Sequence, residues 1–337
     1  MKILFISSTF YPSIGGIQTF SQYLIKYLIK KKNNVILITN TKMNKNEKKK
    51  FNYQIFDKPN QKKINELHDW ANIIFHNHLS IRLSSIKFRH FKKTIITTQY
   101  WLGDRFSLIK FFKRIFLILC SQRIFISKAI MDHVNLNGKI FFNFYNEKIF
   151  LKIKPFTKRK KQIIFVGRMT DEKGVEILLK AITEIKNFLK INEVTFIGSG
   201  DELKRYIILS KELKVFKYIN FINRSHKSLR GYFNNHKIHV VPSKKEPFGI
   251  VALEGNASGC ISILSNNYGL AEFDKKTFQF FENNDYISLS RTLIKNIKKP
   301  SIPKNVNRKN NLSKYQLSHI GKKYLSIFYN VMEKNNV

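Results

Sequence analysis

Short apolar runs alternate with longer stretches in which apolar residues recur every three or four positions. Residues 2–7 form one such run, helical spacing follows over residues 17–31, and a second run occupies residues 34–39. A buried strand of a parallel sheet gives a short continuous apolar run, whereas an amphipathic helix gives the wider period. The start of the chain is therefore predicted to be a strand, a helix and a second strand.

The same alternation continues through both halves of the chain. In the first half, further strands are predicted at residues 72–76, 94–98, 123–127 and 139–143. In the second half, the predicted strands are 162–166, 193–197, 218–221, 238–241 and 260–264, with helices near 174–188, 201–213, 228–234 and 249–258. Strands that alternate with helices in this way predict an α/β protein with two doubly wound, Rossmann-like domains.

The domain boundaries are predicted from the segment between the two halves. Residues 152–161 contain Pro155 and four consecutive bases, which is typical of a linker. The expected domains are residues 1–152 and 153–312. Helical spacing near the end of the chain predicts a helix within residues 313–337, and one hypothesis is that it crosses back to the first domain. The tract 42–50, rich in Asn and Lys, is expected to be an exposed loop.

Charge is the most unusual property of the composition. The chain has 61 Lys and Arg against 22 Asp and Glu, a net charge of +39, and 49 of these bases are Lys. Binding of phosphates through two parallel hydrogen bonds favours Arg, so the excess of Lys, Ile, Asn and Phe is attributed mainly to an AT-rich coding sequence. Residues 1–155 hold 28 bases and only 7 acids, a balance suited to an anionic membrane surface.

Several classes of protein are disfavoured by the same composition. No apolar run approaches the roughly 20 residues that cross a bilayer, and the first residues are too short a run for a signal peptide. Cys120 and Cys260 make neither a metal-binding nor a disulfide pattern. We therefore expect a cytoplasmic protein, with peripheral binding to the inner face of the cytoplasmic membrane as a hypothesis.

The stretch 106–119 combines bases with Phe, Ile and Leu around much of a predicted helix. One interpretation is a helix that lies on a membrane surface. The other, which we favour, is a helix packed on the first sheet, because a strand follows at once and needs a cover. The two are compatible if one edge of the helix stays exposed.

The segment 243–254 carries the strongest local signal for chemistry. Glu246 follows a buried strand, and Pro247 can begin a helix whose free amide groups would bind an anion such as a diphosphate. Glu254 lies eight residues later, on the inward face if the helix packs through Val251 and Ala257. The alternative is a capped helix in which both carboxylates are structural.

Glu246-Pro-Phe-Gly together with Glu254 resembles the E-x7-E signature of the retaining GT-B glycosyltransferases of glycosyltransferase family 4. Residues 165–174, 196–203 and 11–17 resemble further segments of this family, in the same order and spacing. The resemblance extends from residue 1 to about residue 330. It implies the GT-B fold, in which two Rossmann-like domains face each other across a cleft.

The resemblance also implies a donor site. Arg168 and Lys173 would hold the donor diphosphate, Glu246 would contact the donor sugar as a stabiliser rather than a nucleophile, and Glu254 would accept hydrogen bonds from the ribose. The remaining residues implied in donor binding are Gly15, Gly16, Gly198, Gly200, Phe248, Gly249 and Ile250. From the residues alone, solvated bases and purely structural turns remain open alternatives.

Family members often carry His-x-His where this chain has His76 and His78, near the acceptor side, which implies a catalytic role for this pair. An alternating strand would place both rings on one side, and a structural role for one of them stays open. Zinc binding is rejected because no further ligand lies nearby. Gln99 stands where many relatives have His; it can bind a sugar but cannot act as a general base. Asp104 is either an acceptor contact or a helix cap.

These observations predict a retaining glycosyltransferase that moves a sugar, such as a hexose, from a nucleotide sugar to a glycan or a lipid-linked acceptor in bacterial surface polysaccharide or lipopolysaccharide biosynthesis. The alternatives are another GT-B enzyme, such as a nucleotide-sugar epimerase, and a basic nucleic-acid-binding protein, for which no recognition motif is present. The Asp-x-Asp triplet of metal-dependent transferases is absent, so we expect no metal and no cofactor. The expected partners are the donor, the acceptor and an anionic membrane surface, without nucleic acid.

Overall fold

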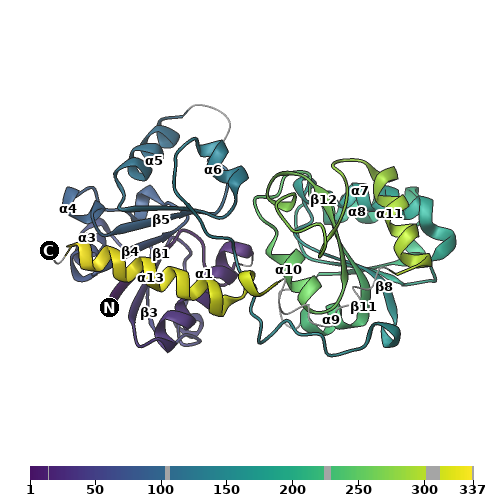
Figure 1. Cartoon of the computed structure of the whole chain (residues 1–337), viewed down its shortest axis with the longest axis horizontal. Helices are drawn as coiled ribbons and strands as arrows, with labels where there is room; N and C mark the ends of the chain where they lie inside the picture. The colour runs from purple at the N-terminus through teal and green to yellow at the C-terminus, as the bar shows by residue number, and fades with distance from the viewer. Residues whose placement is uncertain (14, 103–106, 224–228, 301–311, 336–337) are drawn as a thin grey trace. The chain divides into compact units, whose positions relative to one another are not determined.

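The chain folds into two compact units, shown in Figure 1. The computed structural model describes all residues except 14, 103–106, 224–228, 301–311 and 336–337. One unit comprises residues 1–144 together with 315–337, and the other comprises residues 145–314. The C-terminal segment therefore folds with the first part of the chain.

The first unit is built on a parallel sheet of seven strands in the order β3-β2-β1-β4-β5-β6-β7. The order runs outward in both directions from β1 and β4, as in a doubly wound sheet. The strands are β1 (Lys2–Ser7), β2 (Asn34–Thr39), β3 (Gln54–Asp57), β4 (Ile73–Asn77), β5 (Thr94–Thr98), β6 (Gln122–Phe125) and β7 (Lys139–Ile140).

Helices cover both faces of this sheet, which explains why its strands are apolar at nearly every position. In β1, Ile3 and Phe5 pack against α1 (Gly16–Lys30) and α13 (Leu317–Asn335), whereas Leu4 and Ile6 face α3 (Gln61–Trp70). The other helices of the unit are α2 (Lys45–Lys48), α4 (Phe88–Phe91), α5 (Leu108–Leu119), α6 (Lys128–Val134) and the single turn η1 (Ile81–Leu83). The turn η7 (Ser313–Tyr315) begins in the second unit and ends in the first.

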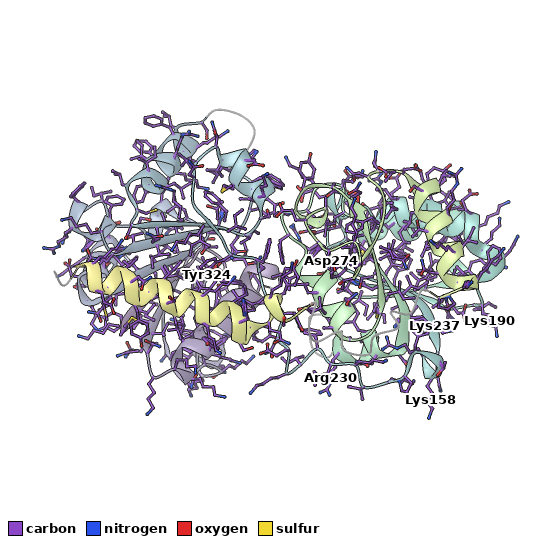
Figure 2. All side chains as sticks on the ribbon, viewed as in Figure 1. Lys158, Lys190, Arg230, Lys237, Asp274 and Tyr324 are labelled. Atoms are coloured by element: carbon purple, nitrogen blue, oxygen red, sulfur yellow. The ribbon has the colours of Figure 1, made fainter. Side chains whose placement is uncertain are left out.

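Helix α13 is an integral part of the first core. Tyr324, labelled in Figure 2, is fully buried and makes ring contacts with Phe20, Phe75 and Phe328, while its hydroxyl lies 3.3 Å from Thr97 Oγ1. The helix approaches α1 so closely that a side chain at Gly321 would overlap the ring of Tyr27. The last helix thus completes a core that the first 144 residues begin.

The second unit has a parallel six-stranded sheet in the order β10-β9-β8-β11-β12-β13. Its strands are β8 (Lys161–Val166), β9 (Val194–Ile197), β10 (Ile219–Ile222), β11 (His236–Val241), β12 (Ile261–Asn266) and β13 (Gln279–Glu282). Its helices are α7 (Val175–Ile185), α8 (Leu203–Glu212), α9 (Leu229–Asn235), α10 (Ile250–Ala257) and α11 (Tyr286–Lys298), with short turns η2 (Phe156–Lys158), η3 (Asp171–Lys173), η4 (Lys186–Phe188), η5 (Phe216–Tyr218) and η6 (Tyr268–Leu270).

The predicted fold class of two Rossmann-like domains is confirmed, with differences in detail. Strands β3 and β13 were not predicted, and the tract 42–50 contains the helical turn α2, in which Asn44 and Glu47 cap each other's backbone. The segment 152–161 is not a free linker. Arg159 is buried and donates hydrogen bonds to the carbonyl groups of His236 and Ser258, which fixes the segment to the second unit.

No helix within the described residues combines the length and the apolar character that crossing a bilayer requires.

We predict that Tyr324→Ala destabilises the first unit by about 3–5 kcal/mol, because it leaves a cavity where a large aromatic ring is fully buried. Both tryptophans of the chain, Trp70 and Trp101, lie in this unit, so urea unfolding followed by tryptophan fluorescence reports on it. Tyr329→Ala, on the exposed side of the same helix, is the control and should change the free energy of unfolding by less than about 0.5 kcal/mol. Equal effects of the two variants would contradict the packing described for α13.

Candidate active site

The loop between β11 and α10 holds the predicted Glu-x7-Glu pair. Ser243 and Glu246 are buried directly after β11, and Gly249 adopts φ 91° at the N-cap of α10, a conformation that glycine favours. The helix begins at Ile250, so the prediction that Pro247 starts it is wrong. Among the described residues no side chain caps this end, and the first amide groups of α10 therefore remain available to an anion.

Glu246 is paired with a lysine from a distant part of the sequence. Lys173, in the η3 turn after β8, donates a hydrogen bond from Nζ to Glu246 Oε2 at 2.5 Å. Ser243 Oγ donates to the same oxygen at 3.1 Å. The side chains of Lys173 and Glu246 are only 20% and 11% exposed, so this ion pair is largely shielded from water.

A second set of contacts holds the same two loops together. The backbone amide of Lys244 donates to the Glu172 carbonyl at 2.8 Å, and Lys244 Nζ lies 2.6 Å from Asp171 Oδ1. Arg168 stands beside this junction with its side chain 55% exposed, and its nearest carboxylate, on Glu172, is 3.9 Å away. An exposed pair of this length contributes little energy, so the Arg168 guanidinium remains able to bind another anion.

The glycine turn after β9 packs directly on the segment that carries Arg168. The Met169 amide donates to the Ser199 carbonyl at 2.9 Å. A Cβ atom at Gly198 would lie 1.8 Å from the Gly167 carbonyl oxygen, and one at Gly200 would lie 2.5 Å from that of Met169. These two glycines are thus required for the close approach of neighbouring loops, and their contact with a nucleotide stays a prediction.

Glu254 is buried in α10. The helix packs through Ala252, Leu253, Gly255 and Asn256, not through Val251 and Ala257 as predicted, and it leaves Glu254 4% exposed. No other described residue makes a hydrogen bond with its carboxyl group, and burial raises its pKa to about 8. Glu254 is therefore mostly protonated at neutral pH and can both donate and accept hydrogen bonds.

In the first unit, the glycine loop leads into α1, whose N-cap is Gly15 and whose first residue is Gly16. Behind this helix start lies a chain of buried polar side chains that sequence reasoning missed. Asn77, at the end of β4, donates to the Ile17 carbonyl at 3.1 Å and to Ser21 Oγ at 2.7 Å. Ser21 is in turn 2.9 Å from Ser7, at the end of β1.

Gln99 belongs to this network. Its side chain is buried, with Nε2 donating to Asn77 Oδ1 at 2.7 Å and Oε1 accepting from Asn143 Nδ2 at 2.9 Å. Both ends of the Gln99 amide are thus used within the protein, which favours a bracing role over direct contact with an acceptor. Asp104, the other predicted acceptor contact, lies outside the described residues.

His76 and His78 do not form the regular pair that alternation along a strand suggests. β4 ends at Asn77, and His78 follows with φ 70°, outside extended geometry. Burial lowers the pKa of His76 to about 3 and that of His78 to about 4, and the nearby Lys113 ammonium adds to the effect at His78. Both rings are therefore neutral at physiological pH. Nδ1 of each has no hydrogen-bond partner among the described residues.

The buried carboxyl group of Glu254 should make the free energy of unfolding depend on pH in a specific way. The pKa of Glu254 in the native state lies above its ordinary value of 4.5, so the native state binds the proton more tightly than the unfolded state. The protonated group therefore stabilises the native state at low pH, and this contribution to the free energy of unfolding is lost as the pH rises from about 4.5 through about 8. Glu254→Gln should remove a slope of up to about 1.4 kcal/mol per pH unit in this window.

Urea unfolding followed by far-UV circular dichroism at pH 5, 6, 7 and 8 measures this slope. Glu212→Gln, at an exposed carboxylate of α8 in the same unit, is the control and should keep it. An unchanged slope in Glu254→Gln would show that Glu254 is charged in the native state.

Comparison with known proteins identifies the family. A family model described as glycosyl transferases group 1 matches residues 146–315, just over half of the chain. An uncharacterized glycosyltransferase of Methanocaldococcus jannaschii is 35% identical over 119 residues, which cover 34% of this chain and 30% of that protein. A D-inositol 3-phosphate glycosyltransferase of Corynebacterium jeikeium is 33% identical over 124 residues, which cover 34% of this chain and 29% of that protein. The chain thus matches less than a third of the length of these curated relatives.

Solved structures match over nearly the whole chain. An Anabaena protein solved in complex with UDP and glucose has a TM-score of 0.80 at 15% identity, covering 98% of this chain and 100% of that one. A lipopolysaccharide outer core galactosyltransferase in its apo form has a TM-score of 0.69 at 13% identity, covering 98% of this chain and 99% of that one. At such identities the likeness concerns the fold. Together with the family match, it shows that the chain belongs to the glycosyl transferases group 1 family and that its two Rossmann-like units have the GT-B fold.

Proposed function

We propose that this protein transfers a sugar from a nucleotide-sugar donor to a glycan or a lipid-linked acceptor. The observation that carries the proposal is the convergence of Lys173 and Glu246 in one shielded ion pair, close in sequence to the uncapped start of α10. A cation, a carboxylate and free backbone amide groups are the groups that a sugar diphosphate needs. Family membership supports the same activity.

Each group has a distinct task in this proposal. Arg168, Lys173 and the first amides of α10 bind the diphosphate and stabilise the negative charge that grows on it as the bond to the sugar breaks. Glu246 then exchanges its contact with Lys173 for the hydroxyl groups of the donor sugar. Ser243 keeps the carboxylate in position during this exchange, because its hydroxyl holds the same oxygen.

Glu254 is well placed chemically to bind the ribose of the nucleotide. Its carboxyl group is buried, has no hydrogen-bond partner among the described residues and is mostly protonated at neutral pH. Such a group binds a vicinal diol well, because it donates one hydrogen bond and accepts another. Binding of the nucleotide would thus relieve the unfavourable burial of Glu254.

We further propose a UDP-sugar donor, transfer with retention and without a metal ion, and a role in the synthesis of a bacterial surface polysaccharide or lipopolysaccharide. The Anabaena structure with UDP and glucose and the lipopolysaccharide galactosyltransferase support this choice through their shared fold. In the first unit, His76, His78 and Asp104 are the proposed contacts for the acceptor, and Gln99 braces the loops behind them. A cytoplasmic location fits a nucleotide-sugar substrate.

Donor binding is tested by thermal shift with UDP-, GDP- and ADP-sugars, because a ligand that binds only the native state stabilises it. We expect a UDP-sugar to raise the unfolding temperature. Lys173→Ala should weaken its binding about 10- to 100-fold through loss of a charged contact with the diphosphate. Lys180→Ala, at an exposed lysine on α7, is the matched control and should bind like the wild type. If no nucleotide sugar shifts the wild-type protein, the proposed site is wrong.

The role of Glu246 is tested by kinetics. Glu246→Gln keeps the shape of the side chain but removes the charge that faces Lys173, and we expect kcat to fall by at least about 100-fold, with a smaller change in KM for the donor. The control is Glu282→Gln, at an exposed carboxylate in the same unit. The assay is run in EDTA, and loss of wild-type activity under this condition would contradict metal independence.

Products distinguish transfer from the epimerase alternative. A glycosyltransferase consumes the donor in proportion to the acceptor supplied and releases the nucleoside diphosphate. Epimerisation or hydrolysis of the donor at the same rate without any acceptor would exclude the proposed transfer.

A further inference from the structure

Helix α5 presents an apolar face to solvent. Only Phe116 and Leu117 of this helix are buried, and α5 reaches α4 through the ring contact of Phe116 with Phe91, 5.0 Å between centroids. Its exposed apolar side chains are Leu108, Ile109, Phe111, Phe112, Ile118 and Leu119, which are between 42% and 71% exposed. Only these two side chains of α5 are thus buried, although the sequence favoured a helix packed on the sheet.

This exposure is concentrated in one part of the molecule. Among the described residues, sixteen large apolar side chains are exposed, and eight of them fall within residues 86–119. Two of the eight, Ile86 and Phe88, are the most exposed apart from Leu108 and lie at the start of α4. Figure 1 shows α5 at the outer edge of the first unit. A cluster of this kind marks an interaction surface.

Helical geometry gathers the exposed residues of α5 into a single stripe. At 100° per residue, Leu108, Phe111, Phe112, Ile118 and Leu119 fall within about one third of the circumference. Arg114 lies beside one edge of the stripe, with Lys110 next to it on the same side, and Arg114 also donates to the carbonyl groups of Val134 and Asn135 at the end of α6. The helix is therefore fixed to its unit with this apolar stripe turned outward.

The positive charge around the stripe indicates which kind of partner it binds. The described residues within 86–119 contain seven bases and no acid. A second copy of the chain would bring this excess against itself, whereas an anionic lipid surface offers both the opposite charge and an apolar layer beneath it. We infer that the α5 stripe docks the protein on an anionic membrane surface, with Phe and Leu side chains inserted among the lipids and the bases along one edge of the stripe at the phosphates.

The docking deepens the proposed function and, in its link to a lipid-linked acceptor, rests on it. Residues 1–144 carry both the α5 stripe and the candidates for acceptor contact. A membrane-bound first unit would therefore meet an acceptor that is confined to the lipid surface. The docking itself requires only the residues of the stripe and can be tested without any substrate.

The experiment is co-sedimentation of the full-length protein with vesicles of phosphatidylcholine alone or with about one third phosphatidylglycerol. We expect the wild type to bind the anionic vesicles at least tenfold more strongly than the neutral ones. The double variant Phe111→Ser, Phe112→Ser should lower binding to anionic vesicles at least tenfold. Ile208→Ser, Phe216→Ser, at exposed apolar positions of the second unit, is the matched control and should bind like the wild type.

Two outcomes would overturn the inference. Equal binding of the stripe variant and the wild type would mean that the net charge, and not α5, attracts the protein to lipid. A wild-type dimer in light scattering that Phe111→Ser, Phe112→Ser dissociates would assign the stripe to a second copy. The thermal shift with the nucleotide sugar is measured on every variant. If that shift is absent from the wild type while vesicle binding persists, the proposed function fails and the docking stands.

Discussion

The contact between Lys173 and Glu246 joins the two loops on which the candidate donor site depends. One loop follows β8 and the other follows β11, and these neighbouring strands of a parallel sheet bring their carboxyl ends to the same edge. The pair is shielded, so each charge would be costly to leave alone. Ser243 and the backbone contact from Lys244 to Glu172 set the geometry within which the ion pair forms. A ligand that carries both negative charge and hydroxyl groups can separate the pair. Its negative charge would replace Glu246 beside Lys173, and its hydroxyl groups would replace Lys173 beside Glu246.

In the first unit, the loops at the carboxyl ends of the strands are held together by neutral groups. At the carboxyl ends of its central strands, a network of amides and hydroxyls runs from Asn143 through Gln99, Asn77 and Ser21 to Ser7. It holds the start of α1 through the Ile17 carbonyl. The two units thus share a fold but differ in the side chains at their sheet edges. The second unit has an ion pair between two loops, and the first has a network of neutral hydrogen-bonding groups.

The sequence predicted what depends on local pattern. All eleven of the expected strands appear in the sheets, most of them because their apolar runs are buried, whereas β3 and β13 are short edge strands with mixed polarity and give no such signal. The motif at residues 243–254 located Glu246 and Glu254, but the pairing of Glu246 with Lys173 spans 73 positions and depends on strand order. The hydrogen-bond network of Asn77, Gln99 and Asn143 could not be predicted for the same reason. These residues are far apart in sequence and meet only because of the strand order.

The discontinuity of the first unit has a consequence for biosynthesis. Its core includes Tyr324, Phe328 and Val331, which are made only after all of the second unit. Until α13 is made, one apolar face of the sheet around β1 and β4 is covered by α1 but lacks the cover that α13 provides. The second unit is therefore synthesised in full before the first unit can complete its core. Truncation near the C-terminus would accordingly harm the N-terminal half of the protein more than the region that directly precedes the cut.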